Sequence, residues 1–397
     1  MQAERKFGET VVVPDGGASS VACLRALGEH GIRTIGISES EQAPALASKY
    51  CTERRIVPDP KEDRAGFRDE LLDLAARADV RAIAPMREVD VFTLARYRSD
   101  FTDHLLPTWP DLETLRDIHD RTRLVEVAAD AGVATPETYL LGDVDDWERQ
   151  QVVKPRFALL AEEYNETMPP DRLGSPGSAE LLQPGVEPDR EQLRNQMGHE
   201  PIVQEYVPGS EYALWALYDD GEAVATCGKH QLRAYKYSGG TSIARETTSI
   251  PALERAGRAV LDALEYDGPA SVQFVRDERT GEFTLLEVNP RFWLSLSCPV
   301  VAGLDFPQLF WQLAGGETVN SVPSYEDGVA THLLRGEAVH LHSVLRDEFP
   351  LVDPPPFTEA LREVAVSVYE EPNFDYLSLT DPGPFLRDAK SVVPLLE

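Results

Sequence analysis

Polar side chains at alternate positions of one apolar run have the types needed to hold a metal ion and a phosphate group. Glu287, Asn289 and Arg291 supply a carboxylate, an amide and a guanidinium. Side chains of a β-strand alternate between its two faces, so Glu287 and Asn289 are predicted to lie on one face, about 6.5 Å apart. The same alternation predicts that Leu286 and Val288 point into an apolar core.

A second strand is predicted upstream, over residues 270–276. The segment 279–281 between the two strands indicates a hairpin loop, with Gly281 at the position that needs a positive φ. Pairing of these two strands places Gln273 beside Glu287.

The chemistry that fits this group is binding of a divalent cation that bridges phosphate oxygens. Mg²⁺ is bound in proteins by one or two carboxylates and completes its shell with substrate phosphates and water. Arg291 offers a planar fork to a phosphoryl group. An ordinary ion pair between a strand-end Glu287 and a nearby arginine explains the spacing equally well.

Composition limits the classes of partner. The 397 residues carry a formal net charge of −30, and only 7 of the 38 basic residues are lysines. Because 42% of the residues are hydrophobic, the chain is expected to fold, in about two or three domains, where salt screens the repulsion among its acids. We interpret the composition as halophilic. The charge argues against nucleic acid and anionic membranes as partners.

The cysteines and the N-terminus indicate a cytoplasmic protein. The cysteines lack metal-ligand spacing and are expected to be free, buried thiols: Cys23, Cys51, Cys227 and Cys298. No secretion signal or membrane span is recognisable in the sequence.

Residues 10–110 alternate strands and helices, which predicts a parallel sheet. The turn that contains Gly16 and Gly17 precedes a helix over residues 19–30 and places backbone N–H groups where an anion could bind. A purely structural turn is the favoured alternative, because the GxGxxG fingerprint is missing. Glu88 and Asp90 follow a later strand and are expected to face the same crevice.

Further along the chain, helical spacing over residues 112–131 predicts a helical connection. Lys154 ends a short strand, and residues 156–192 are rich in Pro, Gly and acids, which predicts a long mobile loop. A hairpin is predicted around residues 219–221. The segment 229–246 is locally basic in an acidic chain and marks a place where an anion is favoured.

Three stretches carry a resemblance to a known family. The run 286–307, LEVNPRFWLSLSCPVVAGLDFP, resembles the metal-binding strand and following helix of ATP-grasp enzymes. The match is to the predicted carboxylate-amine ligase branch, which is similar to carbamoyl-phosphate synthase and D-aspartate ligase. The run 201–211, PIVQEYVPGSE, resembles the hinge strand of these enzymes, and 151–155, QVVKP, resembles the strand that presents a phosphate-contacting lysine.

The resemblance implies a fold of mixed α/β and α+β class. A Rossmann-like pre-ATP-grasp domain is expected over residues 1–110, and a linker helix and lid subdomain over 111–205. A C-terminal ATP-grasp lobe with the metal-binding strand is expected over 206–325, followed by a C-terminal extension over 326–397.

The resemblance also implies roles for individual residues. Arg291 and Lys154 are the implied catalytic residues, with Glu287, Asn289 and Gln273 as magnesium ligands. The residues implied to bind ATP are Arg121, Lys154, Gln204, Glu205, Val207, Glu211 and Lys229. Those implied to contact the substrates are Arg233, Gly239, Gly240, Arg245, Gly16, Gly17 and Ser19. For the basic residues among them, salt bridges to nearby acids are the alternative.

The implied function is that of an ATP-dependent ligase that activates a carboxylate as an acyl phosphate and joins it to an amine, forming a C–N bond. Three residues depart from the family pattern. Gln273 stands where the family has an acid, Arg121 where it has a lysine, and Leu294 where it has a glycine. The alternative is therefore a nucleotide-binding protein with little or no turnover and a regulatory or scaffold role. A dinucleotide-dependent enzyme is disfavoured by the missing fingerprint. Ligases of this kind are often homodimers, and the sequence leaves the oligomeric state open.

Overall fold

The N-terminal strand β1 forms where four β-branched residues follow one another, Thr10–Val13. Val11 and Val13 pack into one apolar cluster and Val12 into another, so the strand is buried on both faces, as is usual for a parallel sheet. We describe this arrangement from a computed structural model that covers residues 8–165, 168–169 and 172–392. Residues 166, 167, 170 and 171 of the loop predicted over 156–192 lie outside the described residues.

The first sheet has four parallel strands in the order β3-β2-β1-β4. After β1, its strands are β2 (Arg33–Ser38), β3 (Glu53–Ile56) and β4 (Val80–Ile83). The helical segments of this region are α1 (Ala18–Glu29), η1 (Pro44–Ala47), α2 (Arg64–Ala75), α3 (Glu88–Arg96) and α4 (Arg98–Thr102). The predicted alternation of strands and helices is confirmed.

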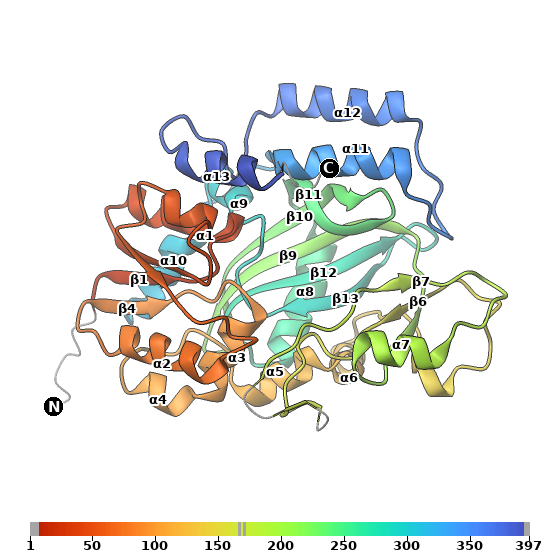
Figure 1. Ribbon diagram of the computed structural model, residues 1–397, viewed down its shortest axis with the longest axis horizontal. Helices are drawn as coiled ribbons and strands as arrows, with labels where there is room; N and C mark the ends of the chain where they lie inside the picture. The colour runs from red at the N-terminus through yellow and green to blue at the C-terminus, as the bar shows by residue number, and fades with distance from the viewer. Residues whose placement is uncertain (1–7, 166–167, 170–171, 393–397) are drawn as a thin grey trace.

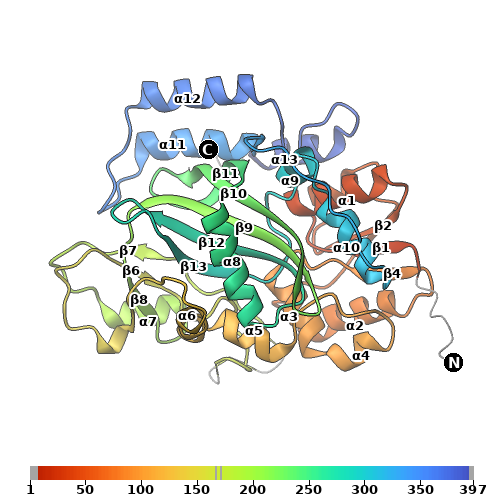
Figure 2. The same cartoon turned by 180° about the vertical axis from the view of Figure 1, so that it is seen from behind.

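The second sheet has six strands in the order β13-β12-β9-β10-β11-β14, with antiparallel neighbours. They are β9 (Gly209–Asp219), β10 (Glu222–Lys236), β11 (Gly239–Thr248), β12 (Gly268–Asp277), β13 (Phe283–Asn289) and β14 (Ala330–His332). Seen from behind, α8 (Pro251–Ala263) crosses one face of this sheet (Figure 2).

A smaller antiparallel sheet, in the order β5-β8-β6-β7, lies at one side of the six-stranded sheet (Figure 1). Its strands are β5 (Thr138–Leu140), β6 (Gln151–Lys154), β7 (Glu180–Leu181) and β8 (Ile202–Glu205). The helical segments of this part of the chain are α5 (Leu112–His119), α6 (Arg121–Asp130), η2 (Leu141–Asp143) and α7 (Arg190–Met197). The fold thus combines a parallel and two antiparallel sheets, and the predicted mixed class is confirmed.

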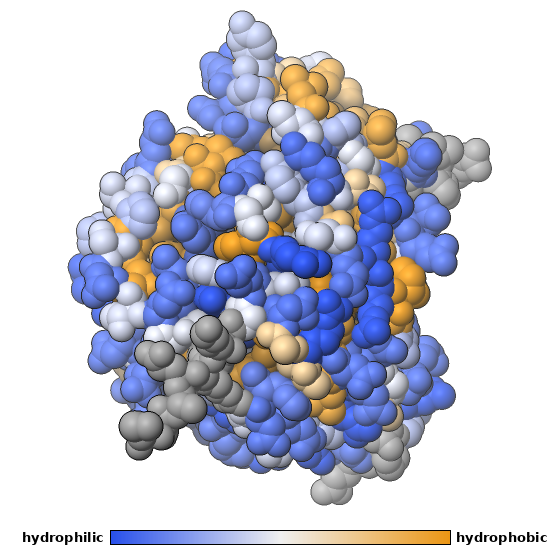
Figure 3. Space-filling model, turned by 90° about the vertical axis from the view of Figure 1, so that its left-hand side faces the viewer, coloured by the Kyte–Doolittle hydropathy of each residue, from blue (hydrophilic) through white to orange (hydrophobic). Residues whose placement is uncertain are grey.

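The remaining helices follow β13. They are α9 (Ser297–Val301), α10 (Phe306–Ala314), α11 (Leu334–Arg346), α12 (Phe357–Glu370) and α13 (Gly383–Val392). Figure 1 shows α12 lying along the outer side of α11. Among the described residues, no helix is long and apolar enough to cross a membrane. The face in Figure 3 is mostly hydrophilic with separate hydrophobic groups, in keeping with the high net charge.

One apolar cluster joins the parallel sheet to the six-stranded sheet. It contains Val11 and Val13 of β1 together with Ala213, Trp215 and Leu217 of β9. The intervening β9 residues belong to the cluster on the opposite face of the sheet, beneath α8. This shared core brings the carboxyl end of the parallel sheet close to the end of β13.

Three details differ from the sequence predictions. Leu286 does not join the buried cluster, because it is the extra residue of a β-bulge: Gln273 pairs with Glu287, whereas the next residue of β12 pairs with Leu285. The basic segment 229–246, for which the sequence predicted no strands beyond its first residue, lies largely in β10 and β11. The helical connection over 112–131 is divided at Asp120, which caps α6.

Candidate active site

The end of β13 and the beginning of α6 form the centre of the candidate site. The Oε1 atom of Glu287 accepts a hydrogen bond of 3.2 Å from Nδ2 of Asn289, so these side chains share a face, as predicted. The other carboxylate oxygen of Glu287 accepts a 2.9 Å bond from Nη2 of Arg121. Burial alone would raise the pKa of Glu287, but Arg121 outweighs this effect and the pKa is lowered.

Lys154 ends β6 next to these groups. Nη1 of Arg121 donates a 2.9 Å hydrogen bond to the carbonyl of Pro155, which ties α6 to the end of β6. Burial, and then the positive charge of Arg121, lower the pKa of Lys154 to about 8, while Glu287 and Glu211 oppose the shift. An anion bound next to Lys154 would therefore stabilise the charged form of this lysine.

The middle of the six-stranded sheet contributes a second group, on β9 and β10. Nζ of Lys229 donates to Oε1 of Gln231 at 2.9 Å, and Nε2 of Gln231 donates to Oε2 of Glu211 at 3.0 Å. Burial lowers the pKa of Lys229 to about 8 and raises that of Glu211. The structure also brings Gly239 to this group, because a Cβ atom there would lie 3.2 Å from Oε1 of Glu211. Gln231 was missed from the sequence, although it shares a strand face with Lys229.

Gly240 joins the same group through its carbonyl oxygen, which accepts a 3.4 Å hydrogen bond from Nε2 of Gln231. The φ values are 118° for Gly239 and 100° for Gly240, the first two residues of β11. These angles favour glycine at both positions.

The predicted hinge residues lie on and after β8, which pairs directly with β6, so that Lys154 is opposite Ile202. Gln204 is buried and donates a 3.0 Å hydrogen bond to the hydroxyl of Thr138. Oε1 of Glu205 accepts two 3.0 Å bonds from Arg279. Val207, just beyond the strand, is half-buried. The structure thus brings this segment beside Lys154, and ATP binding by these residues stays a prediction.

Arg291 lies where β13 meets the N-terminal region. Its Nη2 atom donates a 3.0 Å hydrogen bond to Oδ1 of Asn289, and its Nε atom donates a 2.9 Å bond to Oε1 of Glu88. Glu88, which the sequence placed at this crevice, is the first residue of α3.

Two of the predicted substrate residues form ion pairs with internal carboxylates, and contact of these residues with a substrate stays a prediction. Arg233 forms a two-bond ion pair with Glu337 of α11, at 2.9 and 2.8 Å. Arg245 is fully buried and pairs with Asp375. The alternative of ordinary salt bridges therefore describes both arginines in this structure.

The turn after β1 is also internally bonded. The backbone N–H of Gly16 donates to the hydroxyl of Ser20 at 3.1 Å, and that of Gly17 donates to Oδ2 of Asp15 at 2.9 Å. Ser19 is buried in α1. These bonds fit the structural-turn alternative, and nothing in them supports an anion site at Gly16, Gly17 or Ser19.

The predicted metal ligands lie together at one place. Gln273 pairs in register with Glu287, as predicted, and its amide donates a 2.9 Å bond to the hydroxyl of Ser271. Within residues 8–165, 168–169 and 172–392, no three His, Cys, Asp or Glu side chains are grouped as a metal site. One carboxylate and one amide oxygen, from Glu287 and Asn289, are chemically suited to Mg²⁺ when phosphates and water supply the remaining ligands.

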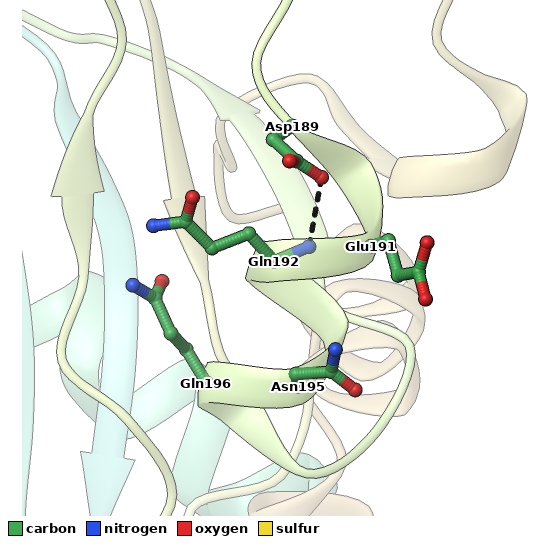
Figure 4. A pocket seen from close by; sticks show the side chains of 5 residues that line it. All are labelled: Asp189, Glu191, Gln192, Asn195 and Gln196. Atoms are coloured by element: carbon green, nitrogen blue, oxygen red, sulfur yellow. Dashed lines mark hydrogen bonds between the residues drawn. The ribbon is translucent and has the colours of Figure 1, made fainter.

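A shallow hollow of about 490 Å³ lies elsewhere, beside α7, and contains none of the predicted residues. Gln192 and Gln196 extend to one side of the helix and Glu191 to the other (Figure 4). The hollow is open to solvent and its lining residues come from one helix and its N-cap, so we assign no chemistry to it.

Comparison with known proteins bears on the fold. Residues 198–336 match a family described as "ATP-grasp in the biosynthetic pathway with Ter operon". The 2-oxoglutarate carboxylase biotin carboxylase domain of Hydrogenobacter thermophilus aligns with a TM-score of 0.61 and 16% identity, over 82% of this chain and 74% of that one. The chain has the ATP-grasp fold.

Further solved structures share this ATP-grasp architecture. The L-amino acid ligase of Bacillus licheniformis aligns with a TM-score of 0.59 and 15% identity, over 78% of this chain and 75% of that one. Pyruvate carboxylase of Rhizobium etli aligns with a TM-score of 0.57 and 17% identity, over 80% of this chain, which spans only 28% of that longer protein. No curated protein sequence gives a significant match. The predicted family resemblance is confirmed at the level of the ATP-grasp fold.

Proposed function

We propose that this ATP-grasp chain is an ATP-dependent ligase that joins a small-molecule carboxylate to an amine. The observation that carries the proposal is the meeting of cationic and acidic side chains from two sheets and one helix. Arg121 contacts Glu287, and Lys154 lies within electrostatic reach of both. Arg291 follows on the same strand end as Glu287.

The proposed reaction has two steps. A substrate carboxylate oxygen attacks the γ-phosphorus of ATP, the bond to the β-phosphate oxygen breaks, and ADP leaves an acyl phosphate behind. An amine nitrogen then attacks the acyl carbon, the C–O bond to phosphate breaks, and the nitrogen loses a proton as the C–N bond forms. Lys154, Arg121 and Arg291 stabilise the charge on the transferring group, so that no protein nucleophile is needed.

Glu287 and Asn289 would hold the magnesium ion that accompanies ATP. When bound, the metal neutralises charge on the phosphate oxygens. In its absence, the contacts of Glu287 with Arg121 and Asn289 keep its carboxylate ionised and oriented.

The test is ADP release over panels of carboxylates and amines in molar KCl. We expect one pair to give turnover that Glu287→Gln and Asn289→Ala reduce by at least about 100-fold, because both would hold the metal that neutralises charge on the phosphate oxygens. The matched control is Glu200→Gln, which removes a comparable charge from an ion pair with Arg194 on the smaller-sheet region. Full ADP release by folded Glu287→Gln protein would refute the role of Glu287 in holding the magnesium ion.

One observation favours a second candidate, a nucleotide-binding protein without turnover. The residue paired with Glu287 is the neutral Gln273, so this cross-strand residue pair offers a single carboxylate. Tight binding of Mg-ATP with no ADP release for any substrate pair supports this candidate. Restored release in Gln273→Glu protein would identify the neutral side chain as the cause.

A further inference from the structure

Glu88 reaches from the N-terminal parallel-sheet region to the candidate active site. Its Oε1 atom accepts a 2.9 Å hydrogen bond from Nε of Arg291, and its Oε2 atom contacts Nε2 of His119 at 2.9 Å. The three residues are distant in the sequence and come from α3, α5 and the segment after β13. The carboxylate therefore bridges a candidate catalytic arginine and a buried histidine.

The charge on Glu88 is maintained by these contacts. Burial alone would raise its pKa, but Arg291 and then His119 outweigh burial, and the pKa of Glu88 is lowered. Its place at the N-terminus of α3 also favours a negative charge. Because an ionised carboxylate only accepts hydrogen bonds, Nε2 of His119 carries the donated proton.

His119 is itself fixed. It is fully buried, and its Nδ1 atom contacts the hydroxyl of Tyr164 at 3.1 Å. The rings of His119 and Tyr164 pack edge to face, with centroids 5.5 Å apart. The buried imidazole of His119 therefore restrains the carboxylate of Glu88.

The contacts of Arg291 show what Glu88 does for it. A guanidinium has five N–H donors, and three of them are used here: Nε to Glu88, Nη1 to the carbonyl of Phe292 at 3.0 Å, and Nη2 to Asn289. One N–H remains on each terminal nitrogen. Glu88 is the charged member of the three partners, so it sets the orientation in which these two donors are presented.

We propose that Glu88 is a positioning residue for Arg291, and that His119 holds Glu88 in place. This inference rests on the proposed ligase function, in which Arg291 contacts the transferring phosphoryl group. Glu88 itself touches neither nucleotide nor substrate in this scheme. Its contribution is to fix the guanidinium before the phosphoryl group arrives.

The test compares Glu88→Gln with Glu53→Gln, a control that removes a carboxylate from another ion pair of the same sheet region, with Arg77. We expect Glu88→Gln to lower kcat by about 10-fold, the value of one hydrogen bond to a charged group, and to change the Kd for Mg-ATP by less than about twofold. Because the Glu53–Arg77 pair is half-exposed, Glu53→Gln is expected to change kcat by less than about twofold.

A double-mutant cycle separates positioning from a general structural effect. If Glu88 acts through Arg291, then Glu88→Gln has no further effect on kcat in an Arg291→Gln background. Additive losses would overturn the proposal. His119→Phe keeps a ring of similar size, removes the donor to Glu88, and is expected to give a smaller loss in the same direction.

A second readout does not depend on turnover. In protein labelled with ¹⁵N-arginine, the Nε–H signal of Arg291, assigned from its loss in Arg291→Lys, is expected to shift in Glu88→Gln and to stay in place in Glu53→Gln. An unchanged Arg291 signal in Glu88→Gln would overturn the inference. Absence of ADP release by the wild-type protein would refute the ligase function instead, and the Nε–H signal would then decide the positioning role alone.

Discussion

Protonation of Lys154 and Lys229 should be coupled to nucleotide binding. Burial lowers the pKa of each lysine to about 8 in the ligand-free protein. At pH 8 each lysine is therefore about half protonated, and a bound triphosphate favours the charged form. Binding of ATP at pH 8 is expected to take up about 0.5 proton per lysine, or about one proton in all.

The affinity for ATP should fall as the pH rises above 8. Between pH 8 and pH 9 the protonated fraction of each lysine falls from about one half to about one in eleven, so the affinity for ATP weakens by about fivefold per lysine. The folding stability of the ligand-free protein changes with pH in the opposite direction. The folded-state pKa lies below the ordinary lysine value of 10.5, so the unfolded chain binds more protons between these values and the free energy of unfolding rises with pH there.

The assay is isothermal titration of Mg-ATP in two buffers of different ionisation enthalpy, at pH 6 and pH 8. Lys154→Met and Lys229→Met are each expected to remove about half of the proton uptake at pH 8, and uptake should be small at pH 6, where both lysines are already charged. The control is Lys61→Met, which removes an exposed lysine. Proton uptake that is absent at pH 8, or that survives both substitutions, would refute the placement of these lysines at the phosphates.

Three further predictions concern stability. Arg245→Met should lower the free energy of unfolding by about 3–5 kcal/mol in urea titrations, because it leaves Asp375 buried without its charged partner; a loss below about 1 kcal/mol would contradict this. Gly268→Ala should lower the free energy of unfolding by about 2 kcal/mol in the same titrations, because φ is +94° and the new Cβ would lie 2.4 Å from the carbonyl oxygen of Thr108. Gly132→Ala should lower it by less, because φ is +71° and the new Cβ would lie in open space. The melting temperature should rise between 0.1 and about 2 M KCl, because salt screens a net charge of −30 over a few ångströms; calorimetry that shows a constant or falling melting temperature would contradict the halophilic interpretation.

Local pattern was sufficient for much of the strand pair at the site. The alternation of side chains placed Glu287 and Asn289 together, and the structure joins them by a hydrogen bond. The predicted loop glycine, Gly281, has φ of +77°, and Gln273 pairs with Glu287. Leu286 was placed wrongly, because one extra residue in a strand reverses the alternation and leaves no mark in the sequence.

The ion-pair partners of the basic segment 229–246 could not be predicted from local pattern. Its positive charge does meet anions, but for Arg233 and Arg245 these are Glu337 and Asp375. The partners lie more than one hundred residues further along the chain, so the charge of the segment could not distinguish a substrate from an internal carboxylate. Gly239 of the same segment lies beside Glu211, where the resemblance had placed a binding site.

The sequence by itself determined the types of side chain and their order along each strand, because strand geometry repeats every two residues and needs no distant partner. It therefore supplied the strand end at Glu287, the lysine that ends β6, and the family resemblance. Only the tertiary structure decided which ends meet. The contacts of Glu287 with Arg121 and of Arg291 with Glu88 join residues 166 and 203 positions apart. Such pairs depend on how the apolar faces of separate sheets pack together, and no spacing along the chain encodes that packing.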